Sequence, residues 1–273
     1  MSRVLDFVGI TFNFTSCLPA GRSLTFNLIC MLIKPLELIT RSWQLYAKNF
    51  NLLMKIILWL LIPAILLSFL PAFKLGLAAV PISIFLTLAS IILSLWISIV
   101  LIMILNQLVK GEEIDLKIIY REGYSKILSY LWVNILIGLV IFFGFFLLIV
   151  PGIIFAVWFS MAIYILIFEE TRGTQALAKS KELVKNYFWA VLWRWVAPYF
   201  VYGMILFAVI YFPIYLIGLL VGAPLAGFAE TPPWWANLIS NIISLAAMPI
   251  FSAVGVLLYK SLKKEKESIS AAK

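Results

Sequence analysis

The segment from Leu147 to Phe188 constrains the fold more than any other part of the chain. It reads LLIVPGIIFAVWFSMAIYILIFEETRGTQALAKSKELVKNYF. This order predicts the end of a membrane helix, a turn at Pro151 and Gly152, a second membrane helix, the acidic pair Glu169 and Glu170, and a basic amphipathic helix. The flanking segments repeat the pattern, with an amphipathic helix ahead of each membrane hairpin.

The composition places the whole chain in a membrane. Of the 273 residues 64% are hydrophobic and only 12% are charged, and the mean hydropathy is +1.09. Soluble domains are roughly half apolar and a quarter charged. The net charge of +9 comes from lysines and arginines beside apolar segments, so we expect contact with anionic lipid head groups and not nucleic acid.

The apolar segments predict an all-α integral membrane protein with six spans in three hairpins. A helix needs roughly 20 residues to cross the hydrocarbon core. The expected spans are residues 52–70, 77–108, 131–150, 152–168, 189–221 and 238–259. They lie in a membrane domain of residues 31–260, followed by a basic tail at 261–273. A larger loop at 222–235 separates the last two spans.

A cytoplasmic amphipathic helix is expected ahead of each hairpin, in residues 32–50, 110–131 and 174–188. In the first, an apolar stripe recurs every three or four positions opposite Lys34, Glu37 and Arg41. This period suits a helix lying in the head-group region. The alternative is an ordinary surface helix like those of soluble proteins.

Residues 1–30 fit this pattern poorly, because they lack a sustained apolar run and contain the turn-like Pro19-Ala20-Gly21. We expect either that Met31 is the native start or that residues 1–30 are a loose tail. N-terminal sequencing of the native protein distinguishes the two.

Lysine and arginine gather in the N-terminal region, in 110–126, in 172–185 and in the C-terminal tail. The positive-inside rule therefore predicts that both termini and these two loops are cytoplasmic. The even number of spans agrees with this.

Two of the amphipathic segments share the pattern S-x2-L-x4-F. It is formed by Ser42, Leu45 and Phe50 in one and by Ser180, Leu183 and Phe188 in the other. We expect an internal repeat of one amphipathic helix plus two spans. Coincidence among aromatic-rich helices is the alternative.

The run from Ile149 to Ile153, the acidic pair, and Ala176 to Leu183 with Phe188 together resemble a bacterial signature. It is similar to the YciC-type inner-membrane proteins and to the membrane domain of some glycerophosphoryl diester phosphodiesterases. This resemblance implies a six-span membrane domain of unassigned role. In those enzymes catalysis belongs to a separate soluble barrel, which implies no such activity for this chain.

The candidate functional residues are Glu169, Glu170, Arg172 and Arg194. The carboxylates could form a gate, a cation site or a proton relay, or they could simply end the span beside basic residues. Arg194 either snorkels, pairs with Glu169 or Glu170, or binds a lipid phosphate. The chain has no histidine and only Cys17 and Cys30 as cysteines, so we expect no metal site, no cofactor and no enzymatic activity.

Two functions remain open at this point. The first is a non-enzymatic envelope scaffold, or a membrane module that contacts lipid or a protein partner. The second is a small oligomeric transporter or channel with a site near Glu169, Glu170 and Arg194. A homo-oligomer or a membrane protein partner is compatible with both.

Overall fold

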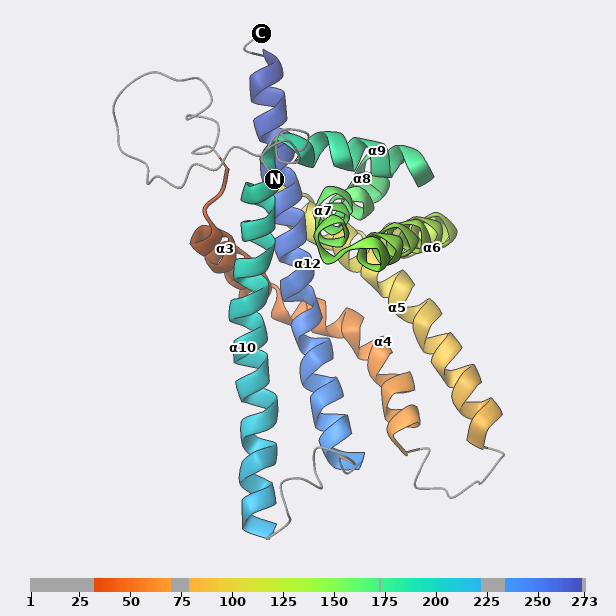
Figure 1. The fold of residues 1–273 in the computed structure, drawn as a ribbon. Helices are drawn as coiled ribbons and strands as arrows, with labels where there is room; N and C mark the ends of the chain where they lie inside the picture. Colours follow the sequence, from red (N-terminus) through yellow and green to blue (C-terminus); the bar gives the residue numbers. More distant parts are fainter. Residues whose placement is uncertain (1–31, 70–78, 172, 222–233, 272–273) are drawn as a thin grey trace. The chain divides into compact units, whose positions relative to one another are not determined.

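The computed structural model describes residues 32–69, 79–171, 173–221 and 234–271, and from Ile33 onward the chain forms one compact unit (Figure 1). The described residues are helical and contain no strand. The predicted tail at 1–30, Met31, the turn after the first span and most of the loop at 222–235 lie outside these residues. The helices are α3 (Pro35–Lys48), α4 (Phe50–Phe69), α5 (Ala79–Lys110), α6 (Leu116–Leu147), α7 (Ile149–Phe159), α8 (Ala162–Glu169), α9 (Gly173–Val184), the 3-10 turn η3 (Lys185–Tyr187), α10 (Phe188–Val221) and α12 (Trp234–Ala271).

Six segments of these helices are long and apolar enough to cross a membrane. They are Phe50–Leu67, Val80–Lys110, Leu116–Leu147, Ile149–Glu169, Gly173–Pro213 and Asn237–Ala271. The prediction of an all-helical, multi-pass membrane protein is therefore confirmed, whereas the sidedness and the interfacial position of the amphipathic helices stay predictions.

Helix α12 is the centre of the unit, because α3, α4, α5 and α10 all pack against it. Its buried face is built from small and branched residues that admit close neighbours on several sides. These residues are Ala247, Ile250, Ala253, Val254, Val256 and Leu258. The helix continues to Ala271, so the predicted tail at 261–273 is mostly its C-terminal extension and not a separate segment.

The middle amphipathic segment and the third predicted span form one continuous helix, α6. Asp115 caps its start, with its side chain accepting from the backbone N–H of Lys117 at 2.9 Å and of Ile118 at 3.3 Å. Because no proline follows, nothing separates the charged first turns from the apolar remainder.

The reversal predicted at Pro151 and Gly152 occurs three residues earlier. Leu148 is the extended residue between α6 and α7, and both predicted turn residues lie in the first turn of α7. Proline is tolerated there because the first N–H groups of a helix have no partner within it. A Cβ on Gly152 would lie 2.6 Å from the ring of Phe145, so glycine allows α6 and α7 to pack closely.

The predicted fourth span is broken in two. Helix α7 ends at Phe159, α8 begins at Ala162, and Ser160 caps the break by donating to the carbonyl of Val157 at 2.8 Å. By contrast, α10 runs unbroken through Pro198 and Pro213.

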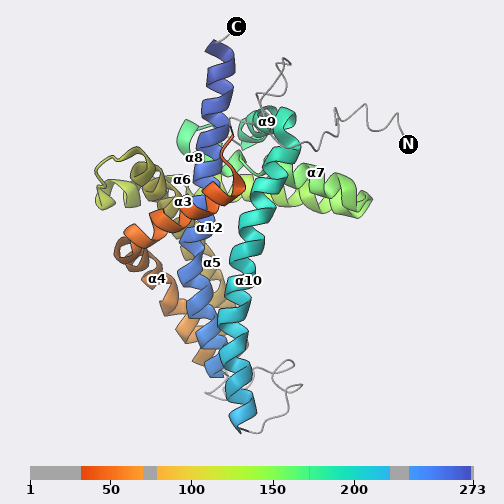
Figure 2. The same cartoon turned by 90° about the vertical axis from the view of Figure 1, so that its left-hand side faces the viewer.

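The α6–α7 pair lies across the long axes of α10 and α12, as the two perpendicular views agree (Figure 1, Figure 2). The expected three hairpins therefore do not run in one direction. The far end of the pair is strongly exposed at five consecutive apolar residues, Phe146, Leu147, Leu148, Ile149 and Val150. Apolar surface of this size requires a non-aqueous neighbour.

The two short amphipathic helices use their apolar faces against protein. The buried side of α9 is Ala176, Leu177, Ser180, Leu183 and Val184, and α9 packs on α6, α7 and α8. In α3 the buried residues are Leu38, Ser42 and Tyr46, which face α10 and α12, while Leu36 and Trp43 stay exposed. Much of each predicted stripe is thus covered by the unit itself.

Candidate functional site

The acidic pair lies where α8 ends and the chain turns into α9. Glu169 is the last residue of α8, and Glu170 adopts the left-handed conformation with φ 52°. A left-handed residue directly after a helix redirects the chain, and it is unusual for a residue other than glycine. Arg172 lies outside the described residues.

The carboxylate of Glu169 joins three helices. Its Oε1 accepts a hydrogen bond from the Tyr259 hydroxyl at 2.8 Å and pairs with Lys263 Nζ at 3.0 Å. Its Oε2 pairs with Lys179 Nζ at 3.1 Å. The side chain is 25% exposed, so these charge-assisted bonds connect α8, α9 and α12 in a partly dry position. We call Glu169, Lys179, Tyr259 and Lys263 the Glu169 cluster.

Two further ion pairs surround this cluster. Lys126 of α6 donates to Glu170 at 3.1 Å and to the carbonyl of Ile167 at 3.3 Å. Lys266 donates to Glu182 of α9 at 2.7 Å. Exposed pairs of this kind contribute little individually, so the Glu169 cluster is the main electrostatic connection.

The hydrogen bonds described for Arg194 go to backbone carbonyls, and the ion pairs described for Glu169 and Glu170 are with lysines. The Arg194 side chain is buried, with Nε donating to the carbonyl of Ile33 at 2.6 Å and a terminal nitrogen donating to that of Ala190 at 3.0 Å. A guanidinium bound to carbonyls in this way holds the start of the α3 region against α10.

The serines of the S-x2-L-x4-F pattern have similar surroundings. Both are 0% exposed: Ser42 lies 2.8 Å from the Tyr202 hydroxyl, and Ser180 donates to the carbonyl of Trp158 at 2.6 Å. Phe50 and Phe188 are the first residues of α4 and α10. Leu183 is buried and Leu45 half-buried. In each copy the serine therefore connects its amphipathic helix to another helix, α10 for Ser42 and α7 for Ser180, shortly before the next long helix begins.

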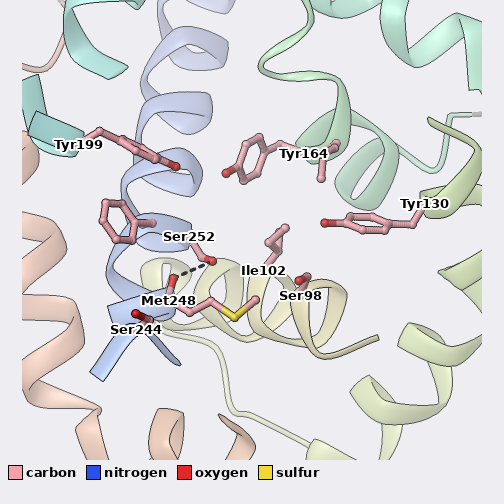
Figure 3. Close-up of a pocket in the computed structure, with 10 residues that line it drawn as sticks. Ser98, Ile102, Tyr130, Tyr164, Tyr199, Ser244, Met248 and Ser252 are labelled. Carbon is pink, nitrogen blue, oxygen red and sulfur yellow. Dashed lines mark hydrogen bonds between the residues drawn. The ribbon is translucent and has the colours of Figure 1, made fainter. Parts of the chain in front are cut away.

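A cavity that the sequence did not predict lies between α5, α6, α8, α10 and α12. Its volume is about 360 Å³. Figure 3 shows hydroxyl groups directed into it from several helices. Its lining residues are Ser98, Ile102, Tyr130, Ile163, Tyr164, Tyr199, Ser244, Met248, Phe251 and Ser252. The sequence pattern that could have indicated this cavity is the presence of tyrosine and serine inside apolar segments. Such residues are usually explained by ordinary hydrogen bonds between membrane helices.

An aromatic layer separates this cavity from the Glu169 cluster. The ring of Tyr164 is stacked on that of Tyr259 with centroids 6.2 Å apart, and Phe168 lies 5.3 Å from Tyr259 on another side. Since Tyr259 also donates to Glu169, one residue contacts both the charged cluster and the wall of the cavity.

Together these features define a multi-pass helical membrane protein with a cavity that carries several hydroxyl groups in its helix bundle and a charged cluster beside it. Comparison with protein-family models, with curated proteins and with solved structures gives no match for this chain.

Proposed function

We propose that the chain is a non-enzymatic membrane module that binds a small molecule in the cavity between α5, α6, α8, α10 and α12. The observation that carries this proposal is the set of six hydroxyl-bearing lining residues in an otherwise apolar bundle. Ligand sites typically combine an apolar wall with a few convergent polar groups, in volumes of roughly 300–1,000 Å³. None of the ten lining residues is an acid, a lysine or a cysteine, which favours binding over chemistry.

Introduced cysteines test whether the cavity is reachable. In a background with Cys17 and Cys30 replaced by serine, we expect Ser244→Cys in the lining to react with a small membrane-permeant thiol reagent. Ala253→Cys is the control, because Ala253 lies on the same helix and is 0% exposed. The proposal would be contradicted if Ser244→Cys were as unreactive toward the thiol reagent as Ala253→Cys.

Transport is the second candidate, and the position of the cavity relative to Glu169 favours it. Tyr164 and Glu169 are five residues apart on α8, which is about 7.5 Å along the axis. The rings of Tyr164 and Phe168 both contact Tyr259, which donates to Glu169. A ligand passing to the charged end of the bundle would require this aromatic layer to open. Uptake into proteoliposomes, with Tyr259→Ala as the opened variant, tests this candidate.

We also propose that anionic lipid contacts the charged end of the bundle. As the family resemblance implies, the protein is further proposed to lie in a bacterial inner membrane with both termini in the cytoplasm. Exposed cations on α6 and α9 support the lipid contact, and the apolar end of the α6–α7 pair offers a surface for lipid, for a second copy or for a membrane partner.

A further inference from the structure

We propose that the cavity takes a neutral, hydroxyl-rich molecule, namely a small polyol or a monosaccharide, either free or as the head group of a neutral lipid. This inference rests on the proposed function, because it identifies the ligand class of that cavity.

The serines of the lining mostly present acceptors. Ser98 donates its hydrogen to the carbonyl of Ser94 at 2.7 Å, and Ser252 donates to that of Met248 at 3.1 Å. Serines that donate back to their own helix keep lone pairs available on Oγ. A ligand at these two positions must therefore supply O–H or N–H donors.

The tyrosines add hydroxyl groups from three other helices. Tyr164 of α8 and Tyr199 of α10 direct their hydroxyls toward one another across the cavity, and Tyr130 of α6 directs its hydroxyl inward from the side of Ser98 (Figure 3). A phenol donates one hydrogen bond and also accepts. Ligand groups that both donate and accept satisfy serines and tyrosines together, and the hydroxyl group is the simplest of these.

The ligand is neutral because no lining residue carries a charge that would balance an ion. The glutamate beyond the aromatic layer already has two lysines and a tyrosine. An ionised ligand would lose its water without an opposite charge, which is costly in an apolar bundle.

Two other ligand classes fit the geometry less well. A quaternary ammonium group requires ring faces around it, whereas Tyr130, Tyr164 and Tyr199 present their hydroxyl ends (Figure 3). A purely apolar ligand would offer these hydroxyls no hydrogen-bond partner.

The size agrees with this class of ligand. A volume of about 360 Å³ corresponds to about a dozen waters at roughly 30 Å³ each. A monosaccharide or a small polyol fits this space with a few waters.

The experiment measures protection of Ser244→Cys from the thiol reagent in the Cys17→Ser, Cys30→Ser background. The probes are glucose and inositol as neutral ligands. Glucuronate and glucosamine are matched in size but carry a negative and a positive charge. A second arm uses nanodiscs with a neutral glycosyl diacylglycerol or with phosphatidylglycerol, which distinguishes a lipid head group from a free solute.

We expect saturable protection by at least one neutral sugar, polyol or glycolipid, and none by the charged sugars. Each of Tyr130→Phe, Tyr164→Phe and Tyr199→Phe should raise the half-protecting concentration about three- to tenfold, which is the value of one hydrogen bond. Tyr211→Phe is the matched control, because Tyr211 is exposed on α10 and outside the lining.

The outcomes distinguish a failure of the proposed function from a failure of the proposed ligand class. If Ser244→Cys does not react at all, the proposed function itself fails. If it reacts but the charged sugars protect as well as glucose, or no neutral probe protects, the ligand class is overturned while the cavity remains reachable. Unchanged protection in all three tyrosine variants also overturns the ligand class.

Discussion

The hydroxyl of Tyr164 lies over Gly255, at the position where any other residue would carry its Cβ. This contact lets α8 and α12 approach with a tyrosine between them. Tyr164 is then enclosed by Gly255 on one side and the ring of Tyr259 on another, so the two helices fix one wall of the cavity.

Gly255→Ala should therefore displace Tyr164. We expect a loss of about 1–3 kcal/mol in the free energy of unfolding, as for an overpacked core, together with altered reactivity of Ser244→Cys. Thermal unfolding in detergent measures the first effect. Gly138→Ala is the control, because a Cβ at Gly138 meets nothing within 4 Å and alanine favours the helix. Equal stability of the two variants would contradict this contact.

The second prediction concerns the Glu169 cluster. Glu169→Gln removes the charge that Lys179 and Lys263 share, and we expect it to cost about 1–3 kcal/mol and to loosen α9. Hydrogen exchange of α9 amides is the measurement. Glu170→Gln provides the comparison, since Glu170 is 76% exposed and, among the residues that the structure describes, pairs with Lys126, so a loss below about 1 kcal/mol is expected. If both variants exchange alike, the cluster does not hold α9.

The sequence was sufficient for the class of fold because membrane crossing depends on length and hydropathy, which can be read directly along the chain. It was not sufficient to predict the directions in which the helices run relative to one another. Nothing local to α6 and α7 indicates that this pair lies across α10 and α12, because helix packing in lipid depends on contacts between distant segments. Similarly, Pro151 and Gly152 marked the correct region of the reversal but not Leu148, the residue where it occurs.

The site was predicted only in part. Glu169 was singled out by its position at the end of an apolar run, and the structure places it in a cluster with two lysines. Its partners could not be inferred, since Tyr259 and Lys263 lie about 90 residues further along the chain. The cavity was missed for the same reason, because five helices contribute to its lining and no single segment contains its pattern.

The third prediction addresses the buried serines of the two S-x2-L-x4-F segments. Ser42→Ala and Ser180→Ala should each reduce stability by about 1 kcal/mol, because each removes a buried interhelical hydrogen bond. Ser83→Ala should change stability by less than about 0.5 kcal/mol, because Ser83 of α5 makes an exposed hydrogen bond to the carbonyl of Val80 in its own helix. Thermal unfolding of the three variants under one condition provides the comparison. A serine variant as stable as Ser83→Ala would show that this bond contributes nothing.

The fourth prediction tests contact with anionic lipid. Phosphatidylglycerol should raise the melting temperature of the detergent-solubilised protein more than phosphatidylcholine does, because cations at the membrane surface gain about 1 kcal/mol each from anionic lipid. Replacing the exposed Lys117 and Arg121 by glutamine should reduce this difference. Lys266→Gln should reduce it less, since Lys266 is already bound to Glu182. Equal stabilisation by the two lipids would argue against this partner.

The fifth prediction concerns sidedness, and the Lys126–Glu170 pair makes it specific. Because these residues are 3.1 Å apart, the charged segments 110–126 and 172–185 must lie on the same side of any membrane that the bundle crosses. In the background lacking Cys17 and Cys30, Ser125→Cys and Gln175→Cys should both react with an impermeant thiol reagent in inside-out vesicles and not in intact cells. Lys74→Cys and Glu230→Cys, in the predicted outer turn and loop, should show the opposite pattern. Labelling of Ser125→Cys and Gln175→Cys from different sides would rule out both the ion pair and the positive-inside arrangement.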